Sequence, residues 1–339
     1  MKPRCGLLCL AASLLLCGLS RAAAASLDEI RAVSNLPAFD PAQLEHGEIL
    51  NARGSLGNFP RGVYAESLYL VHASVEVAGN KLLHWNPSNH AQLEITTLRE
   101  YRWPAPANSW EALRLDPAHA GDRWLIDRTS RLPNPSSDEL HLTASERSNA
   151  QSVPAGERAA PATEFWRKIL RARDGAVATG ALDALPSYHA GNQQIAARSE
   201  FTSLLQMAPG IAAHFAGLTK RAPFVAGQPV ADAIVPYWEA ANVRGHTNLH
   251  AGFITAQKGA GSWQLADCTY YTSDTYFFSV TLYELIPQAN GTLVWQIDFA
   301  SAPFRGFTGG IDRLVAGNLM IKEAAKTARF FRADLEQGH

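Results

Sequence analysis

Two histidines have the type and spacing that most directly indicate chemistry. His246 and His250 stand four positions apart, and on a helix this spacing would place both imidazoles where they could bind a metal ion. A zinc-protease helix needs glutamate after the first histidine, and Thr247 stands there instead. The neighbouring residues favour a strand, on which the two histidines share a face with Asn248. We expect that face to be solvated. The alternatives are a polar lining for a cavity and a metal site, and we assign no metal ligand.

The sequence contains no clear motif for a catalytic nucleophile. The run Gly54 to Gly57 lacks the Gly-x-Ser-x-Gly pattern that exposes a nucleophilic serine on a strand-to-helix turn. Cys268 lies in a strand-like run and is expected to be a small buried hydrophobe. Acid–base work inside a cavity is the remaining catalytic alternative, and its candidates are Tyr271, Tyr276 and Arg305. We assign no catalytic residue and no cofactor.

The chain begins with a segment that predicts export. Lys2 and Arg4 precede an almost continuously apolar run, and Ala22 to Ala25 form a small-residue cleavage site. This is the pattern of a secretory signal peptide over residues 1–25, and its apolar run is too short to span a bilayer as a helix. We predict a secreted or periplasmic protein. The alternative is a lipoprotein acylated at Cys17.

Composition excludes several classes of protein. The 339 residues include 30 basic and 31 acidic ones, and removal of residues 1–25 leaves 27 basic and 31 acidic residues. This balance offers no basic footprint for nucleic acid. Three of the four cysteines lie within residues 1–25, so the remaining chain has no intramolecular disulfide and no cysteine-based zinc site. With 47% hydrophobic residues, the chain can bury a large core.

The elements that would position these residues follow an α+β order. Residues 62–71 predict a strand because they are rich in β-branched and aromatic residues, and Ser74 is expected to cap a short helix after it. Residues 133–161 are rich in Ser, Pro and Asn and predict a long exposed loop. A helical insertion is expected over 163–222.

The last hundred residues predict the main sheet and its cover. Asn290-Gly291, a strong hairpin signal, separates the last two of four strand-like runs, which span 237–257, 262–272, 275–286 and 292–300. A helix from Ile311 to about Leu335 follows, and its broad apolar side suits it to cover a sheet. We predict a curved antiparallel sheet that grips this C-terminal helix.

Two stretches of this plan resemble the START-like (helix-grip, polyketide-cyclase-like, SRPBCC) superfamily. Ser67 to Ala78, with Leu82 to Trp85, is similar to the first strand and first helix of that family. Thr292 to Phe299, then Pro303 and the helix from Ile311, are similar to its last strand and gripping helix. The resemblance implies a START-like domain over 61–335, after a lead-in at 26–60. It also implies an apolar cavity between the sheet and the C-terminal helix, and no invariant catalytic residue.

Two apolar rows, at alternate positions of the last two strands, supply the predicted ligand-binding residues, because alternate side chains of a strand share a face. In a START-like fold this face would line the cavity. A core filled by the same side chains is the open alternative. Together with Leu314 of the long helix, the predicted residues are Tyr276, Phe278, Val280, Leu293, Trp295, Ile297 and Phe299.

The function that the resemblance implies is binding of a hydrophobic ligand, such as a lipid, a sterol-like molecule or an aromatic compound, by an exported protein. Contact with a membrane surface is a further expectation. One alternative is a START-like cyclase or hydrolase-type enzyme that uses the same cavity. Another is a non-catalytic exported protein with a filled core that acts through its surface.

Overall fold

The computed structural model describes residues 27–132, 140–150, 158–259, 261–304 and 309–337. The predicted signal peptide, including Cys17, lies outside these residues, as do Arg305 and parts of the predicted loop 133–161. Within the described ranges, no helix is long and apolar enough to cross a membrane.

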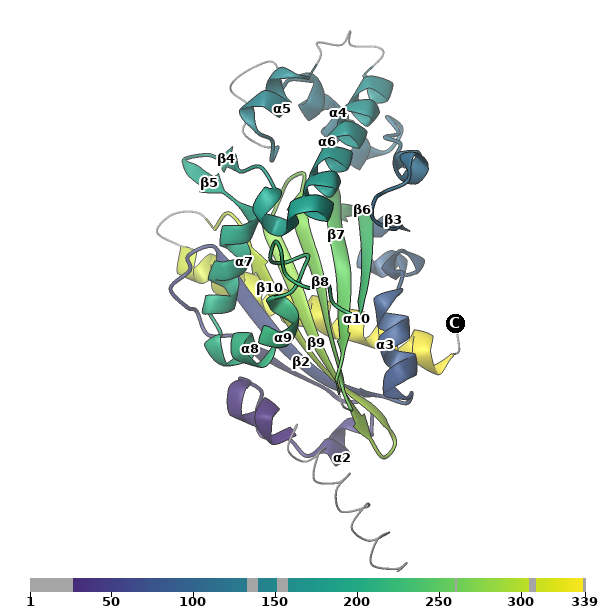
Figure 1. Ribbon diagram of the computed structural model, residues 1–339, viewed down its shortest axis with the longest axis vertical. Helices are drawn as coiled ribbons and strands as arrows, with labels where there is room; N and C mark the ends of the chain where they lie inside the picture. Colours follow the sequence, from purple (N-terminus) through teal and green to yellow (C-terminus); the bar gives the residue numbers. More distant parts are fainter. Residues whose placement is uncertain (1–26, 133–139, 151–157, 260, 305–308, 338–339) are drawn as a thin grey trace, which may run out of the picture.

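An eight-stranded antiparallel sheet forms the centre of the fold, in the order β1-β2-β10-β9-β8-β7-β6-β3 (Figure 1). Its strands are β1 (Ile49–Arg53), β2 (Gly62–Val71), β3 (Ile95–Glu100), β6 (Ala233–Val243), β7 (His246–Lys258), β8 (Trp263–Thr272), β9 (Phe278–Gln288) and β10 (Gly291–Ser301). The last strand, β10, lies between β2 and β9. Segments from both ends of the chain therefore meet inside the sheet, and the predicted α+β class is confirmed.

Helices from the middle of the chain cover one face of this sheet (Figure 1). Buried Asp174 holds the longest of them against the sheet side, because its Oδ1 accepts hydrogen bonds from Tyr101 Oη at 2.7 Å and Trp103 Nε1 at 2.6 Å. The predicted helical insertion is thus confirmed as helical. Its elements are α6 (Ala159–Gly180), α7 (Ala197–Gln206), α8 (Pro209–His214) and α9 (Ala216–Thr219), and α4 (Ala120–Ser130) precedes them.

The opposite face is covered by α10 (Gly309–Glu336) and α3 (Val75–Leu83). Figure 1 shows α10 crossing behind the strands, as the helix-grip prediction requires. Near its end, Asp334 Oδ2 accepts hydrogen bonds from Trp85 Nε1 at 2.7 Å and from His90 Nε2 at 3.0 Å. These bonds tie the C-terminal end of α10 to the segment that follows α3.

The structure divides one predicted strand in two. The run 237–257 contains β6 and β7, joined at Arg244-Gly245, where φ is 53° and 83°. A two-residue hairpin with both φ values positive usually carries Asn or Gly at the first position. Because Arg244 occupies that position, the sequence gives no signal for this turn. The described part of the predicted loop 133–161 contains a short helix, α5 (Ala144–Ser148), with a capping box at Thr143.

The predicted lead-in at 26–60 takes part in the same sheet. Its residues 49–53 form β1, which pairs with β2 as an edge strand. Asn35 also reaches the sheet, where its backbone N–H and its Nδ2 donate to Glu66 Oε1 at 2.9 and 2.8 Å. The lead-in is therefore packed as part of the domain.

Two glycines inside helices offer a matched test of how closely α3 lies on the sheet. A Cβ at Gly79 of α3 would lie 2.3 Å from Trp263 Cε3, whereas a Cβ at Gly175 of α6 would meet nothing within 4 Å. Alanine is favoured over glycine in a helix interior by about 1 kcal/mol. We expect Gly175→Ala to raise the free energy of unfolding by up to about 1 kcal/mol. Gly79→Ala should lower it by about 1–3 kcal/mol, because Trp263 must move. Urea denaturation measures both, and equal effects would contradict the close packing.

Candidate functional site

A cavity of about 340 Å³ lies between the sheet and α10, within the size range of small-molecule sites. Its floor comes from five neighbouring strands, β6 to β10, and is mostly polar, although β7 contributes the apolar Ile254. The polar side chains are Tyr237, Glu239, Asp267, Thr269, Ser279, Thr281, Tyr283, Gln296 and Asp298. Its rim is mostly apolar and includes Leu82, Trp85, Leu93, Ile95, Leu98, Met320 and Ala324.

Strand register decides which row of β10 reaches this cavity. Gln296 and Asp298 line it, and Val294 packs in the same cluster as Phe331 of α10. Trp295, between them in sequence, points to the other face, where its ring lies 5.6 Å from the ring of His214 and 5.8 Å from that of Phe215. The polar row of β10 therefore faces the C-terminal helix.

The predicted apolar rows are buried except for Tyr276, which is half-buried, but their expected position beneath the C-terminal helix is wrong. Of the described residues that line the cavity, Phe299 alone belongs to the predicted set, and its ring stacks on Tyr64 at 5.0 Å on the opposite face. Leu314 is half-buried on α10 and does not line the cavity. The residues that pack against the helical layer are Phe278, Val280, Leu293, Trp295, Ile297 and Phe299.

Two other predicted residues have structural partners on the helical side. Tyr271, an acid–base candidate, lies beneath the guanidinium of Arg173 at 4.0 Å, and its Oη donates to the carbonyl of His141 at 3.0 Å. Cys268 is a free, fully buried cysteine, which confirms its prediction as a small buried hydrophobe.

His250 was expected on a solvated face, and this expectation is wrong, because β7 is covered on both sides. His250 is buried, with Nδ1 donating to Glu239 Oε1 at 2.6 Å and its ring 5.3 Å from that of Tyr276. Its Nε2 is also buried and has no hydrogen-bond partner among the described residues. Glu239 lines the cavity, and His250 stands behind it.

The other two residues of the histidine motif, Asn248 and His246, have structural contacts away from the cavity. Buried Asn248 donates from Nδ2 to the carbonyl of Asp274 at 2.7 Å and so holds a turn. The ring of His246 packs 4.1 Å from that of Trp124. Within the described ranges, no three histidine, cysteine, aspartate or glutamate side chains gather as a metal site.

Two half-buried aspartates form the centre of the cavity floor. Asp267 and Asp298 stand on the strands either side of β9, each opposite Thr281. Asp267 accepts a hydrogen bond from Tyr237 Oη at 2.7 Å, and Asp298 accepts one from Thr281 Oγ1 at 2.8 Å. Tyr237 can lie across β7 because Gly252 has no side chain there: a Cβ would be 2.4 Å from its Oη.

Burial raises the pKa of both carboxyl groups. The pKa of Asp267 is about 7, chiefly because burial removes the hydration of the charge, with the nearby charges of Glu239 and Asp298 adding to the effect. The pKa of Asp298 is about 6 for the same first reason, although hydrogen bonds from Gln296 and Thr281 act to lower it. The floor therefore titrates near neutral pH.

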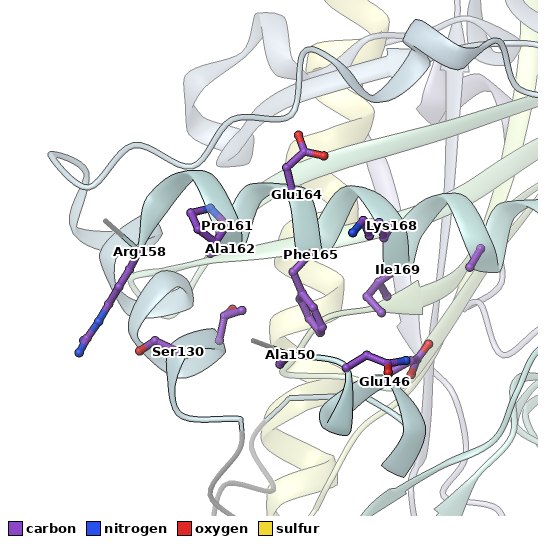
Figure 2. Close-up of a pocket in the computed structure, with 13 residues that line it drawn as sticks. Ser130, Glu146, Ala150, Arg158, Pro161, Ala162, Glu164, Phe165, Lys168 and Ile169 are labelled. Carbon is purple, nitrogen blue, oxygen red and sulfur yellow. The ribbon is translucent and has the colours of Figure 1, made fainter. Parts of the chain in front are cut away.

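A second pocket, of about 470 Å³, lies beneath α6 (Figure 2). Figure 2 shows Phe165 pointing from α6 toward Ala150. Ala150 and Arg158, which line this pocket, border the segment 151–157, which lies outside the described residues. We therefore base no function on this pocket.

The raised pKa of Asp267 predicts a pH-dependent stability. The folded chain keeps this proton at pH values where the unfolded chain has lost it, so the stabilisation is complete below about pH 4 and is lost as the pH rises through about 7. Asp267→Asn should remove a slope of at most about 1.4 kcal/mol per pH unit. Asp298→Asn should remove a contribution that ends near pH 6.

Urea denaturation between pH 4 and pH 8 measures these slopes. Asp127→Asn is the control, because Asp127 on α4 has a side chain that is 53% exposed. Curves for Asp267→Asn that run parallel to those of the unaltered protein would contradict the assignment.

Comparison of the chain with family models, with curated proteins and with solved structures finds no match. What the structure shows is the architecture: an eight-stranded antiparallel sheet packed against a long C-terminal helix.

Proposed function

We propose that the protein binds a small amphipathic molecule in the cavity between the sheet and α10. The observation that carries this proposal is the division of the cavity into a polar floor and an apolar rim. Ligand sites are commonly apolar hollows with a few convergent polar groups that fix orientation. The head of the ligand would contact Asp267 and Asp298, and its apolar body would contact Trp85 and Leu98.

This proposal keeps the predicted hydrophobic ligand but changes what holds it. The apolar rows of β9 and β10 are packed against α7 and α8, where Trp295 contacts Phe215, so those side chains serve the core. Hydrophobic contact with a ligand falls instead to the rim, including Met320 and Ala324 of α10. As part of the same proposal, the signal-peptide pattern of residues 1–25 supports an exported protein.

A cavity-filling substitution tests the binding site. Thr327 of α10 lines the cavity and is half-buried, whereas Leu319 of the same helix is 58% exposed. We expect the neutral dye Nile red to bind saturably, one molecule per chain. Thr327→Trp should weaken this binding about tenfold or more because the indole occupies the cavity.

The matched control is Leu319→Trp, which adds the same side chain to the surface of α10 and should bind the dye normally. Circular dichroism establishes that both variants are folded. Equal dye affinity in the two folded variants, measured by fluorescence titration, would defeat the proposed site.

A second candidate function is proton transfer at a bound ligand. It is favoured by the buried His250–Glu239 pair, in which His250 Nε2 has no partner among the described residues and Glu239 lines the cavity. A paired histidine whose second nitrogen is free has the form of a general base. The ring of Tyr276, a predicted acid–base candidate, lies beside it.

Hydrogen exchange in a small ketone tests this second function. In D₂O, a base that removes a proton next to the carbonyl of 4-phenyl-2-butanone leaves an enolate, which then takes up a deuteron. We expect the protein to accelerate the loss of that proton signal in NMR spectra, and His250→Gln to abolish the acceleration. His246→Gln, on the same strand, should not. If the protein gives no acceleration, the second function is excluded for this ketone-binding chemistry and the binding proposal stands.

A further inference from the structure

The charged side chains that line the cavity are all acidic among the described residues. Four of the described lining residues are acids, namely Glu239, Asp267, Asp298 and Glu323, and none is lysine, arginine or histidine. Two of these acids have basic partners behind the wall: Glu239 pairs with His250, and Glu323 pairs with Lys326. The hydrogen bonds to Asp267 and Asp298 come from neutral groups.

Asp267 and Asp298 therefore have no positively charged side chain paired with them among the described residues. A carboxylate that the protein partly removes from water is most stable as an anion when a positive charge compensates its lost hydration. The raised pKa values of Asp267 and Asp298 express this cost. A cation in the cavity would offset it, and a neutral or anionic head group would not.

Gln296 supplies an independent observation at the same place. Its Nε2 donates to Oδ1 and Oδ2 of Asp298 at 3.1 and 3.0 Å. These bonds fix the amide orientation, since the reverse would put its oxygen against a carboxylate. The remaining atom, Oε1, is buried without a partner among the described residues, and Gln296 is 2% exposed and lines the cavity. A ligand that donates an N–H or O–H would satisfy this unpaired acceptor.

Strand geometry argues against a metal ion shared by the two acids. Asp267 and Asp298 are separated by the whole of β9, each opposite Thr281, so their Cα atoms lie about 10 Å apart at two strand spacings. Calcium takes its ligands at about 2.3–2.6 Å and needs six or more oxygens around one point. An organic cation can contact one acid closely while remaining in the field of the other.

We infer that the ligand of this cavity is a protonated primary amine with an apolar body. An ammonium group has N–H donors for Gln296 Oε1 and Asp298 together, and the rings of Tyr237 and Tyr283, which also line the cavity, add cation–π attraction. A quaternary ammonium would leave Gln296 Oε1 unpaired. The inference rests on the proposed function, because it names the chemical class of the molecule that the cavity binds.

This ligand class makes binding depend on pH in one direction. The amine binds the ionised aspartates, so its affinity falls as the pH drops through about 7 and then about 6 and the two carboxyl groups take up protons. The other titratable groups that line the cavity are Glu239, Glu323, Tyr237 and Tyr283. His250 and Lys326 stand behind the two glutamates. An alkylamine itself stays protonated over this range, as a lysine side chain does.

Calorimetric titration of the full chain with three octyl probes tests the inference. At pH 8, in buffer with a chelator, octylamine should bind at least about tenfold more tightly than 1-octanol or octyltrimethylammonium. The octylamine affinity should fall at least about tenfold between pH 8 and pH 5, a measurement that needs no variant. Asp298→Asn should remove the preference for octylamine over 1-octanol, and Asp127→Asn should leave that preference as it is.

The outcomes separate the inference from the proposed function. Equal affinities for the three probes, or an octylamine affinity that does not change with pH, would overturn the amine and leave the cavity as a site for other amphipathic molecules. If octyltrimethylammonium bound more tightly than octylamine, the inferred N–H donor to Gln296 Oε1 would be wrong. Octylamine binding that calcium displaces competitively would assign the acids to a metal. Failure of all three probes and of Nile red would defeat both proposals.

Discussion

Both faces of the central sheet are covered, and this constraint governs the rest of the structure. An inner strand of such a sheet has no row that faces water, so its polar row must find partners inside the protein. In β10 the apolar row meets α7 and α8, while Gln296 and Asp298 lie beneath α10. The cavity therefore exists where the fold buries polar side chains and does not fill the space around them. Its chemistry is set by the pairs of groups that the register of β8, β9 and β10 brings together.

Buried acids on the two faces differ in how fully they are satisfied. On the helical face, Glu66 accepts hydrogen bonds from Asn35 and from Trp295 Nε1, and Asp174 accepts from Tyr101 and Trp103. Each of these acids holds a segment of chain against the sheet. On the α10 face, Asp267 and Asp298 accept hydrogen bonds only from neutral groups that also line the cavity, and the amide that supports Asp298 keeps one acceptor unpaired. The acids on the helical face thus hold the fold together, whereas those on the α10 face are placed to contact a ligand.

Local signals in the sequence predicted the elements well, and the covering of the sheet was harder to predict. The strand at 62–71, the cap at Ser74 and the long C-terminal helix all carry their own composition or capping chemistry, and the structure has each of them. The Arg244-Gly245 turn lacks such a signal. Alternation in β10 separated Trp295 from Asp298 correctly, but a periodicity of two does not say which layer covers which row. A polar row in an otherwise buried strand was the available sign of the cavity.

The position of β10 in the sheet has a consequence for how the chain is made. Val71 of β2 pairs with Thr292 of β10, 221 residues later. At synthesis rates of about 5–20 residues per second, β10 is made about 11 to 44 seconds after β2, its neighbour in the sheet. Until then its apolar residues, such as Leu68 and Leu70, lack the strand that will cover their edge, and an unpaired edge invites pairing with other chains. Closing so long a loop also favours slow folding. The insertion of β10 between β2 and β9 thus leaves β2 as a strand that needs protection during synthesis.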